Sequence, residues 1–409
     1  VLEELEEVLH QAVADRLESE VPLGAFLSGG IDSGLIVSYM ARALQESPKT
    51  ISVGFEDSAH NELEAAQRVA DRYGTDHHAE ILKPTLEEML ERIVDGCDEP
   101  FADSSAVPTY YVCEGARRHV TVCLSGDGGD ESFGGYDFRY VPHAWEDRAR
   151  RMVPGAPGRG LLRGMARVWP RSPRLPRPLR LATLLENVGR DPADAYFQDL
   201  CFLKPWDTRR LMGQAPDRDP RASSVYDAVT EPYRRCPSDS VVQRAQYADL
   251  KVYLPNDPLV KVDRMSMLHS LEVRCPLLDR RVVELAFRLP TATKMPDLRA
   301  KHLLKELAAR HLPEANLKLP KKGFTAPVAR WLAGPDGERF ADEVLRTDSA
   351  VAGMVDQGVV RSWLAAHRRG DADRSYALWA VWVLERWARR EGNPGRAAVD
   401  PTHPAQAPA

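Results

Sequence analysis

The sequence predicts an α/β protein whose core is a doubly wound parallel sheet, followed by a helical C-terminal part. Three observations lead to this prediction. The region 1–135 alternates strand-like runs with amphipathic helix patterns, each strand is an almost unbroken apolar run, and glycine-rich loops follow two of the strands. Unbroken apolar strands are typical of parallel sheets that helices cover on both faces.

The apolar periodicity places the elements in order. A helix with an acidic outer face is expected over 2–18, where apolar residues recur at spacings of three and four, and Pro22 forces the chain out of it. Strands are expected over 23–27, 50–55, 77–81 and 120–124. The helices between them are expected over 32–44, 61–73 with Asn61 as its cap, 85–94 and 108–118. A strand order of 3-2-1-4 would make the first and fourth strands neighbours.

The composition excludes several classes of protein. The 409 residues carry 55 Lys and Arg against 60 Asp and Glu, a net charge of −5, which argues against a bulk polybasic nucleic-acid binder. With 43% hydrophobic residues a real core is expected, and the length suggests two domains or one large domain with a subdomain. Because no run of roughly 18 apolar residues occurs, no transmembrane segment is expected.

The cysteines and the start of the chain bear on the compartment. None of the six cysteines forms a CxxC pair, which argues against a compact zinc site or a thioredoxin-type redox pair. Cys113 and Cys123 lie in apolar stretches and are expected to be buried free thiols, so we expect a reducing, cytoplasmic location. The chain starts at Val1 with an acidic segment, unlike a signal peptide, and we interpret this start as a cut or processed end.

The segment 148–180 departs most from the mean composition. It holds ten arginines, no lysine and no acid, interleaved with six prolines. The prolines exclude one long helix, although residues 161–169 have a short amphipathic pattern. We favour a solvated linker or surface subdomain; the alternative is a docking surface for an acidic partner, anionic lipid or phosphate. The Gly-, Pro- and Ala-rich tail 391–409 is expected to be disordered.

The loop 28–33, SGGIDS, has the elements of an anion cradle. Gly29 and Gly30 let backbone amides approach a ligand, the following helix N-terminus is electropositive, and Ser28 and Ser33 add hydroxyl donors. It is not a Walker loop, because GxxxxGK[ST] is absent. Asp32 would repel a phosphate unless a cation such as Mg²⁺ intervened. A plain strand-to-helix turn, with Asp32 favouring the helix dipole, is the alternative.

A second loop, SGDGGDE at 125–131, follows the fourth strand. Its acids Asp127, Asp130 and Glu131 lie within five positions and would repel one another without serving any packing need. A metal ion or a proton-transfer role explains them better than a solvated turn does. Because ligands of such sheets bind beyond the carboxyl ends of the strands, both loops would face one crevice if strands one and four are neighbours.

These residues carry a family resemblance. The SGGIDS loop resembles the pyrophosphatase loop, SGGxDS, of the N-type ATP pyrophosphatases, the PP-loop superfamily with its adenine nucleotide α-hydrolase-like fold. Three further stretches narrow the resemblance: LSGDGGDE at 124–131 with FGGY at 133–136; DRMSM, SLEVR and PLLD within 263–279; and KKGF at 321–324 with Pro327 and Trp331. Together they resemble the synthetase domain of glutamine-dependent asparagine synthetase, over roughly residues 2–390.

The resemblance implies an ATP-dependent reaction. The side-chain carboxylate of aspartate attacks the α-phosphorus of ATP to give an acyl-adenylate and pyrophosphate, and ammonia then displaces AMP to form the amide. Two alternatives stay open. One is the same chemistry on another carboxylate, as in amidotransferases that tailor a polysaccharide, peptide or other natural product. The other is a catalytically silent binding domain that docks through the Arg-rich segment.

The resemblance also implies residue roles. The backbone of Leu27 and Val53 and the turn Ser125-Gly126 would hold adenosine and ribose. The departing pyrophosphate would be held by Ser28, Gly29, Gly30 and Ser33, and Mg²⁺ by Asp32 and Asp130. Asp127 would handle protons when ammonia attacks; many relatives carry Glu there. Lys321, which we prefer over Lys322, would stabilise charge at the α-phosphate from a mobile loop.

The expected organisation follows the motifs. Residues 1–140 are expected to form the PP-loop ATP-binding core, 141–240 an Arg/Pro-rich insertion with helices, 241–390 a helical part that completes the site, and 391–409 the tail. A glutaminase half with an N-terminal cysteine nucleophile is missing, since no cysteine precedes Cys97. Ammonia would come from a removed glutaminase domain, from another protein or free from solution. A homodimer is possible, and no nucleic-acid partner is expected.

Other residues that could suggest a metal or binding site are interpreted as structural. His77 and His78 are adjacent in a strand and would point to opposite faces. Helix capping explains part of the polar cluster that comprises Asp98, Glu99, Asp103, Ser104 and Ser105, which the resemblance places beside the acceptor site. A charge network is expected from Asp263, Arg264, Glu272 and Arg274. The helically spaced Trp379, Trp382 and Trp387 are expected in the core.

Overall fold

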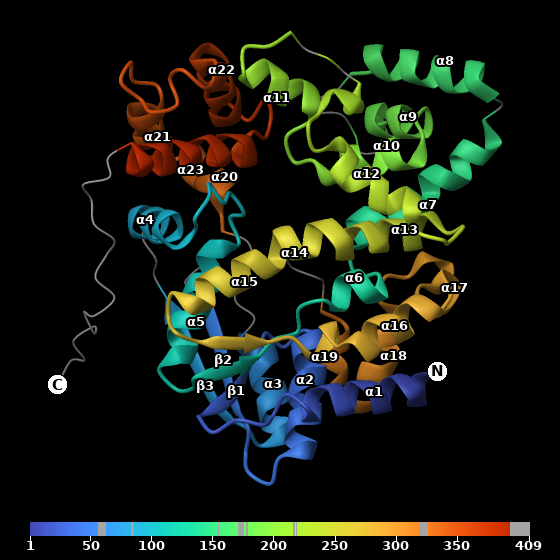
Figure 1. The fold of residues 1–409 in the computed structure, drawn as a ribbon, viewed down its shortest axis with the longest axis vertical. Coiled ribbons are helices and arrows are strands. Elements are labelled where there is room, and N and C mark those ends of the chain that lie inside the picture. Colours follow the sequence, from blue (N-terminus) through green and yellow to red (C-terminus); the bar gives the residue numbers. More distant parts are fainter. Residues whose placement is uncertain are drawn as a thin grey trace. The chain divides into compact units, whose positions relative to one another are not determined.

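The computed structural model describes residues 1–55, 63–82, 86–153, 155–170, 176, 179–215, 217, 219–319 and 326–392. They form two compact units (Figure 1). The first unit comprises Val1–Lys83, Pro108–Cys201 and Arg218–Phe324, and the second comprises Pro84–Val107, Phe202–Asp217 and Thr325–Ala409. The boundaries expected at residues 140, 240 and 390 stay predictions, and the expected tail lies almost wholly outside the described residues.

Among the described residues, five strands form one parallel sheet in the first unit. They are β1 (Leu23–Phe26), β2 (Lys49–Phe55), β3 (Asp76–Leu82), β4 (Val122–Leu124) and β5 (Glu272–Arg274). Their order is β3-β2-β1-β4-β5, and every neighbouring pair is parallel. The expected order of the first four strands is therefore confirmed, and β1 and β4 are neighbours.

Strand β5 was not expected from the sequence. It is three residues long, lies at the edge of the sheet and starts with the exposed Glu272, so it lacks the apolar run by which the other strands were found. The Glu272 amide donates to the Thr121 carbonyl at 2.9 Å, and the Arg274 carbonyl accepts from the Ser125 amide at 2.8 Å. Of the expected charge network, Glu272 and Arg274 form an ion pair at 2.6 Å.

Helices cover both faces of the sheet, as a doubly wound fold requires. Ala25 and Leu27 pack into a large core with helices α2 (Ile31–Ala43) and α3 (Leu63–Tyr73). Phe26, between them in sequence, packs instead with Cys113 of helix α5 (Ala106–Arg117). Because alternate strand residues point to opposite faces, α5 lies on the other side of the sheet from α2 and α3. The predicted fold class is confirmed.

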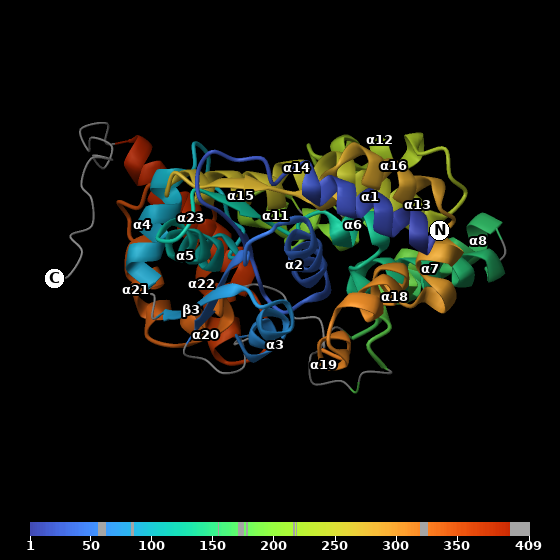
Figure 2. The same cartoon turned by 90° about the horizontal axis from the view of Figure 1, so that it is seen from below.

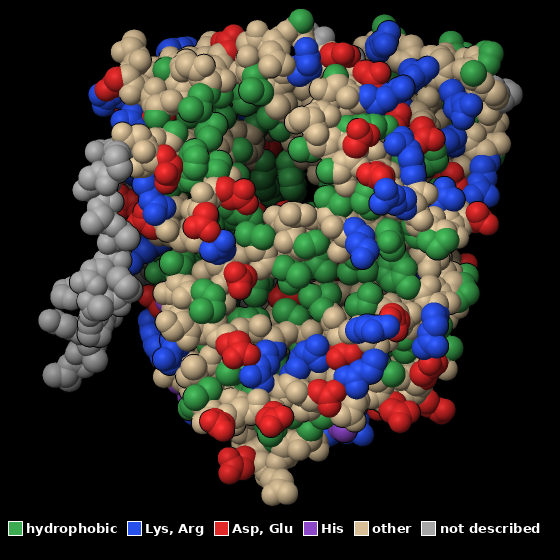
Figure 3. All heavy atoms as spheres, in the orientation of Figure 1, with side chains coloured by type: hydrophobic (Ala, Val, Ile, Leu, Met, Phe, Trp, Pro, Cys, Tyr) green, Lys and Arg blue, Asp and Glu red, His purple; other side chains and the backbone are tan. Residues whose placement is uncertain are grey.

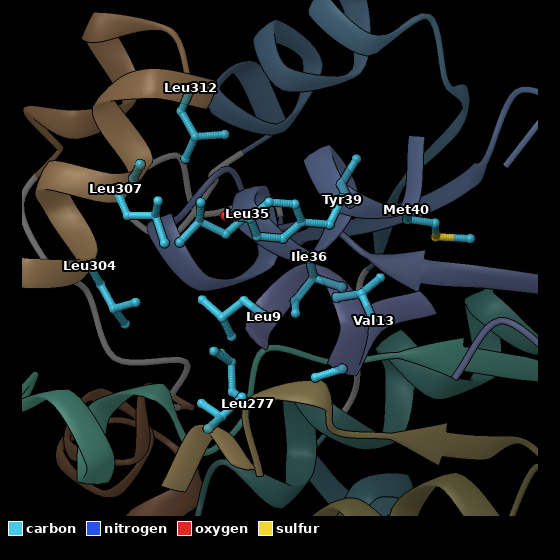
Figure 4. Packing of buried hydrophobic residues seen from close by; sticks show 14 of the residues in the cluster. Leu9, Val13, Leu35, Ile36, Tyr39, Met40, Leu277, Leu304, Leu307 and Leu312 are labelled. Atoms are coloured by element: carbon cyan, nitrogen blue, oxygen red, sulfur yellow. The ribbon is translucent and has the colours of Figure 1, made fainter. Parts of the chain in front are cut away.

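The large core joins the start of the chain to helices more than 270 residues later. Helix α1 (Leu2–Ala14), four residues shorter than expected, packs beside α16 (Arg280–Arg288), as Figure 2 shows. Helix α18 (His302–His311) packs against α2. Figure 4 shows the buried side chains that interlock there: Leu9, Val13, Leu35, Ile36, Tyr39, Met40, Leu277, Leu304, Leu307 and Leu312. The N-terminal sheet and the helices of residues 280–312 therefore share one core.

A second core lies among helices of the same unit. Its buried residues come mainly from α7 (Asp137–Met152), α10 (Pro192–Leu200), α12 (Tyr226–Arg235) and α13 (Val241–Ala248). Tyr140, Tyr196, Phe197 and Tyr233 are among its fully buried side chains. The same unit also contains α8 (Gly155–Val168), α9 (Ala182–Val188), α14 (Leu254–Asn256), α15 (Pro258–Met267) and α17 (Thr291–Lys294). A π-helical turn, η4 (Asp249–Tyr253), follows α13.

The Arg-rich segment forms helix where its prolines allow it. Helix α7 ends at Met152, and α8 runs from Gly155 to Val168, immediately before Trp169 and Pro170. Helix α8 packs against α9 but fully buries only Ala166, and Leu161 and Val168 are 66% and 83% exposed. Figure 3 shows Lys and Arg side chains gathered over α7 to α9. Residues 171–175 of the segment lie outside the described residues.

The second unit is helical in its described part. It contains α4 (Leu86–Gly96), α11 (Pro205–Leu211), α20 (Val328–Ala333), α21 (Asp336–Val344), α22 (Gln357–Arg368) and α23 (Ser375–Glu391). Trp379 and Trp382 of α23 are fully buried, as expected, and Trp387 is half-buried. Asp103 accepts a hydrogen bond from the Ser105 amide at 2.9 Å, as capping predicts.

Two further expectations concern cysteines and membrane spans. All six cysteines are free, and Cys113 and Cys123 are completely buried. Among the described residues, no helix combines the length and apolarity that a bilayer span needs.

Candidate active site

The loop after β1 is held in a conformation that requires glycine. Gly29 has a φ of +74°, and a Cβ there would lie 2.4 Å from the backbone carbon of Ala65 in α3. Gly30 caps the 13-residue helix α2, whose N-terminal amides face the loop. The hydroxyls of Ser28 and Ser33 lie 3.0 Å apart, and Ser33 also accepts from the Ser28 amide at 3.2 Å. A cradle of this kind suits a phosphate group.

Asn316 anchors this loop from a helix that is remote in sequence. It lies in α19 (Glu314–Leu317) and is 2% exposed. Its Nδ2 donates to the carbonyls of Gly29 at 2.9 Å and Ala65 at 2.8 Å, and its Oδ1 accepts from Arg68 Nε at 3.1 Å. Sequence reasoning missed Asn316, since a single asparagine outside any motif carries no local signal for so distant a partner.

The loop after β4 touches the loop after β1. A Cβ on Gly126 would lie 2.8 Å from the Cβ of Asp32 and 3.0 Å from the Ser33 amide nitrogen. A Cβ on Gly129 would lie 2.5 Å from Asp32 Oδ1. The two glycines therefore let the acidic loop close against the start of α2. The two loops meet at the carboxyl ends of β1 and β4, where the sequence had placed a crevice.

Asp32 and Asp130 share one ammonium group, that of Lys301. Lys301 Nζ contacts Asp32 Oδ2 and donates to Asp130 Oδ1 at 2.7 Å. The lysine side chain is 8% exposed. Burial by itself lowers the pKa of Lys301, but the charges of Asp130 and Asp32 outweigh it and raise the pKa above that of a free lysine. The ammonium is therefore charged. Sequence reasoning missed Lys301, which is 269 residues from Asp32 and lies in no motif.

The donor set around this ammonium fits a magnesium ion. Asp32 and Asp130 converge on a single cation, and Mg²⁺ in nucleotide sites is typically held by one or two carboxylates together with phosphate oxygens and water. Among the described residues there is no group of three or more His, Cys, Asp or Glu side chains arranged to hold a metal. Phosphate oxygens and water would therefore have to complete the coordination.

Asp127 lies at the end of β4 with a different set of neighbours. Its carboxylate accepts a short hydrogen bond from the Ser125 hydroxyl. Burial, with a contribution from the negative charge of Asp127, raises the pKa of Cys113 to about 12, and the same two causes raise the pKa of Cys275. Asp127 is only half-buried, so its carboxylate stays within reach of solvent and of a ligand.

Glu131, the third acid of the loop, points into the protein. It is 2% exposed and accepts from the Tyr136 hydroxyl at 2.7 Å. Burial and the charge of Asp130 raise the pKa of Glu131 to about 7. Nearby, Lys294 Nζ donates to the Ser132 carbonyl at 3.1 Å, and burial lowers the pKa of Lys294 to about 7. These groups support the short helix α6 (Gly129–Phe133), which carries Asp130.

The remaining expected residues have separate positions. The Leu27 amide donates to the Ile51 carbonyl at 2.8 Å, and Val53 lies in β2 next to β1. Lys321, with Lys322, Gly323 and Phe324, lies outside the described residues. His77 Nδ1 lies 2.9 Å from the Thr50 hydroxyl. His78 stacks on His119, with ring centroids 3.7 Å apart. The two adjacent histidines therefore contact different residues, as their opposite orientations in a strand predicted.

Comparison with known proteins identifies the family. The family model described as asparagine synthase matches residues 4–389. The chain belongs to the asparagine synthase family. Asparagine synthetase (glutamine-hydrolyzing) 1 of Bacillus subtilis is 32% identical over 389 residues, which are 95% of this chain and 59% of that protein. Family membership makes the parallel sheet a PP-loop sheet, as the SGGIDS loop predicted.

Other relatives of the chain differ in their names. A putative asparagine synthetase (glutamine-hydrolyzing) of Mycobacterium bovis is 34% identical over 391 residues, 94% of this chain and 57% of that protein. Amidase chry2 of Gibberella zeae is 25% identical over 404 residues, 87% of this chain and 57% of that protein. The chain thus spans less than two thirds of the length of each of these relatives.

Proposed function

We propose that this chain is the synthetase part of an ATP-dependent amide-forming ligase that converts aspartate to asparagine. The observation that carries the proposal is the closure of the SGGIDS loop against the acidic loop at the ends of β1 and β4, in a chain of the asparagine synthase family. Activation of a carboxylate needs a pyrophosphate cradle and a cation site, and the later attack of ammonia needs a group that takes up a proton; the two loops offer a candidate for each.

The first step forms an acyl-adenylate. A carboxylate oxygen of aspartate attacks the α-phosphorus of ATP, the bond from that phosphorus to the bridging β-oxygen breaks, and pyrophosphate leaves. The amides of Gly29 and Gly30, the hydroxyls of Ser28 and Ser33 and the N-terminus of α2 receive the pyrophosphate. The two hydroxyls, which face each other, would turn toward the phosphate oxygens.

The other ATP contacts come from the strand ends. The backbone of Leu27 and Val53 and the turn Ser125-Gly126 hold adenosine and ribose. Asp32 and Asp130 would hold Mg²⁺, which would offset the negative charge of the phosphates. Lys321 stabilises the charge that develops on the nonbridging oxygens of the α-phosphate.

The second step forms the amide. Ammonia attacks the acyl carbon, the carbon–oxygen bond to AMP breaks, and Asp127 takes up a proton from the attacking nitrogen. The Ser125 hydroxyl, which donates to Asp127, orients the carboxylate for this task. Ammonia comes from a glutaminase domain, from a separate partner or from solution. A cytoplasmic location and a homodimer stay predictions.

A second candidate acceptor is a carboxylate other than aspartate. The specific observation in its favour is the similarity to a relative named as an amidase, Amidase chry2, over 87% of this chain. The chemistry at ATP would be the same, because the roles proposed for the SGGIDS loop and the acidic loop concern ATP, Mg²⁺ and the reacting carboxylate. A domain that only binds and does not catalyse is the least favoured alternative.

Pyrophosphate release separates these candidates. The purified chain is incubated with ATP, MgCl₂ and ammonium chloride, and with aspartate or one of a panel of other carboxylic acids, and pyrophosphate is measured by a coupled enzyme assay. Release that depends on aspartate, with asparagine and AMP as products, supports the proposal. Release only with another acid supports the second candidate, and no release with any acid contradicts both. Asp32→Ala serves as the inactive control.

A further inference from the structure

We propose that Lys301 is a built-in counter-cation that makes the Asp32–Asp130 pair bind a divalent cation together with a nucleotide rather than alone. In this view the ammonium and the metal ion compete for the same two carboxylates, and the phosphates of ATP relieve the competition. The inference rests on the proposed function in one respect, because it takes Asp32 and Asp130 as the metal ligands.

The contacts of the ammonium place it where a metal ion would bind. Lys301 Nζ touches Asp32 Oδ2 and donates to Asp130 Oδ1 at 2.7 Å, so it lies between the two oxygens that a shared cation would take. The carboxylates themselves remain 24% and 21% exposed, whereas the lysine side chain is 8% exposed. A ligand can therefore reach the carboxylates, although the lysine that contacts them is largely buried.

The backbone holds the ammonium in this place. Lys301 precedes α18 with a φ of +57°, a conformation that costs a residue with a Cβ about 1 kcal/mol or more. Its amide donates to the Gly134 carbonyl at 3.1 Å, just after α6, and the helix that it starts is anchored by the buried Leu303 and Leu304. Strained conformations persist where the surrounding structure enforces them, and they concentrate at functional sites.

The charges of the three groups give the proposed consequence. The charge of Lys301 offsets one of the two carboxylate charges, so it weakens the attraction of the pair for a free divalent ion. A divalent ion bound beside the ammonium would bring a second positive charge next to the first in a partly buried place, where like charges repel strongly. The phosphates of ATP supply the missing negative charge, so a metal–nucleotide complex suits the site and a free metal ion does not.

A purely structural salt bridge would behave differently. If Lys301 only stabilised the fold, its removal would leave two adjacent carboxylates and lower the stability of the protein, but it would not change the order in which metal and nucleotide bind. The two views therefore differ in the affinity for a metal ion in the absence of nucleotide, which is measurable without any turnover.

The test measures Mn²⁺ binding, with Mn²⁺ as a paramagnetic substitute for Mg²⁺. Free Mn²⁺ is followed by electron paramagnetic resonance during titration of wild type, Lys301→Met and Lys305→Met, each with and without α,β-methylene-ATP. Lys305 is exposed on the same helix one turn later, so its variant loses the same charge away from the site. Circular dichroism melting in EDTA establishes that each variant is folded.

We expect wild type and Lys305→Met to bind Mn²⁺ weakly without the analogue and tightly with it. Lys301→Met should bind Mn²⁺ alone at least about tenfold more tightly than wild type and depend less on the analogue. The added substitution Asp32→Asn should remove that gain. Should Lys301→Met fail to fold, Lys301→Gln keeps a hydrogen-bonding group without the charge and gives the same readout.

The two ways of failing are distinguishable. Equal or weaker binding of Mn²⁺ alone to Lys301→Met, in a series where wild type binds Mn²⁺ with the analogue, overturns the role of Lys301 and leaves the proposed function intact. Absence of Mn²⁺ binding to wild type even with the analogue contradicts the assignment of Asp32 and Asp130 as metal ligands, and with it the proposed function.

Discussion

Two charge clusters of the first unit differ in how exposed their carboxylates are and in how many donors each carboxylate has. The first, at the ends of β1 and β4, brings Asp32 and Asp130 onto one lysine, and both carboxylates remain partly exposed. The second, at the π-helical turn η4, surrounds the completely buried Asp249. There Oδ2 accepts from Arg139 Nη1 at 3.0 Å and from the Tyr140 hydroxyl at 2.6 Å, and Oδ1 accepts from the Tyr196 hydroxyl.

The difference teaches how to tell a structural cluster from a ligand site. Around Asp249 each carboxylate oxygen has its own donors, and the Arg139 guanidinium also lies over the rings of Tyr136 and Tyr253, at 4.8 and 4.4 Å from their centroids. Such a cluster is satisfied within the protein. At Asp32 and Asp130 one lysine contacts two partly exposed acids at the carboxyl ends of parallel strands, which favours exchange with an external ligand.

The largest expected effect is on catalysis, at the first cluster. Asp32→Ala should abolish pyrophosphate release, a loss on the order of 10³-fold or more, because one of the two proposed metal ligands is gone. Melting by circular dichroism should show a folded protein. Full retained activity would contradict the role of Asp32 and remove the contrast with Asp249.

The second effect is on stability, at the other cluster. Asp249→Leu leaves the buried Arg139 without its carboxylate and should lower the free energy of unfolding by about 3–5 kcal/mol. Urea unfolding followed by circular dichroism measures it. Asp239→Leu, at a solvent-exposed position, is the control and should stay within about 0.5 kcal/mol. Equal effects of both substitutions would argue against a structural role for the Asp249 cluster.

The third effect tests the loop that approaches the first cluster. Gly29→Ala should lower stability by about 1–3 kcal/mol, because its Cβ would collide with the Ala65 backbone and its φ is positive. Gly30→Ala is the matched comparison, since φ is −72° there and the nearest atom is the movable Ser28 hydroxyl at 3.2 Å. Thermal melts of both variants decide it, and a larger loss for Gly30→Ala would contradict the described loop geometry.

The fourth effect is a pH dependence of the stability that arises at Glu146 in helix α7. Burial, and then the charge of Asp199, raise the pKa of Glu146 to about 8, despite a hydrogen bond from the Asn187 amide at 2.8 Å. Between pH 4.5 and 8 the folded state thus holds a proton that the unfolded state loses, so this glutamate makes stability fall as the pH rises. Urea unfolding at pH 5 and pH 8 should show a smaller fall for Glu146→Gln than for wild type. An identical fall would contradict the raised pKa.

The smallest effect is expected on α8, remote from both clusters. Gly164 lies inside this helix, and no atom lies within 4 Å of where a Cβ would be. Gly164→Ala should raise the free energy of unfolding by up to about 1 kcal/mol through helix propensity, with pyrophosphate release unchanged. A destabilised variant in urea unfolding would show that this face of α8 packs against something else.

Much of the fold and of the site could be predicted from local patterns. Strands β1 and β4 are apolar runs, and strand-like segments alternate with segments of helical periodicity up to residue 124, so the strand order and the helices on both faces followed from the topology of parallel sheets. The loops that hold Gly29, Asp32, Asp127 and Asp130 were found for the same reason. Their glycines and acids are adjacent in sequence, and a turn between a buried strand and a helix leaves them few other conformations.

Only the tertiary structure decided what these local pieces meet. Lys301, Asn316 and β5 come from the chain beyond residue 270, and their positions depend on the core that α16 and α18 share with α1 and α2. No local rule encodes that packing, because long-range contacts depend on how whole helix faces fit together. The sequence by itself determined where the two loops lie and which acids they carry. The tertiary structure decided that Asp32 and Asp130 share a lysine, while Glu131 turns into the protein, where burial makes it easier to protonate.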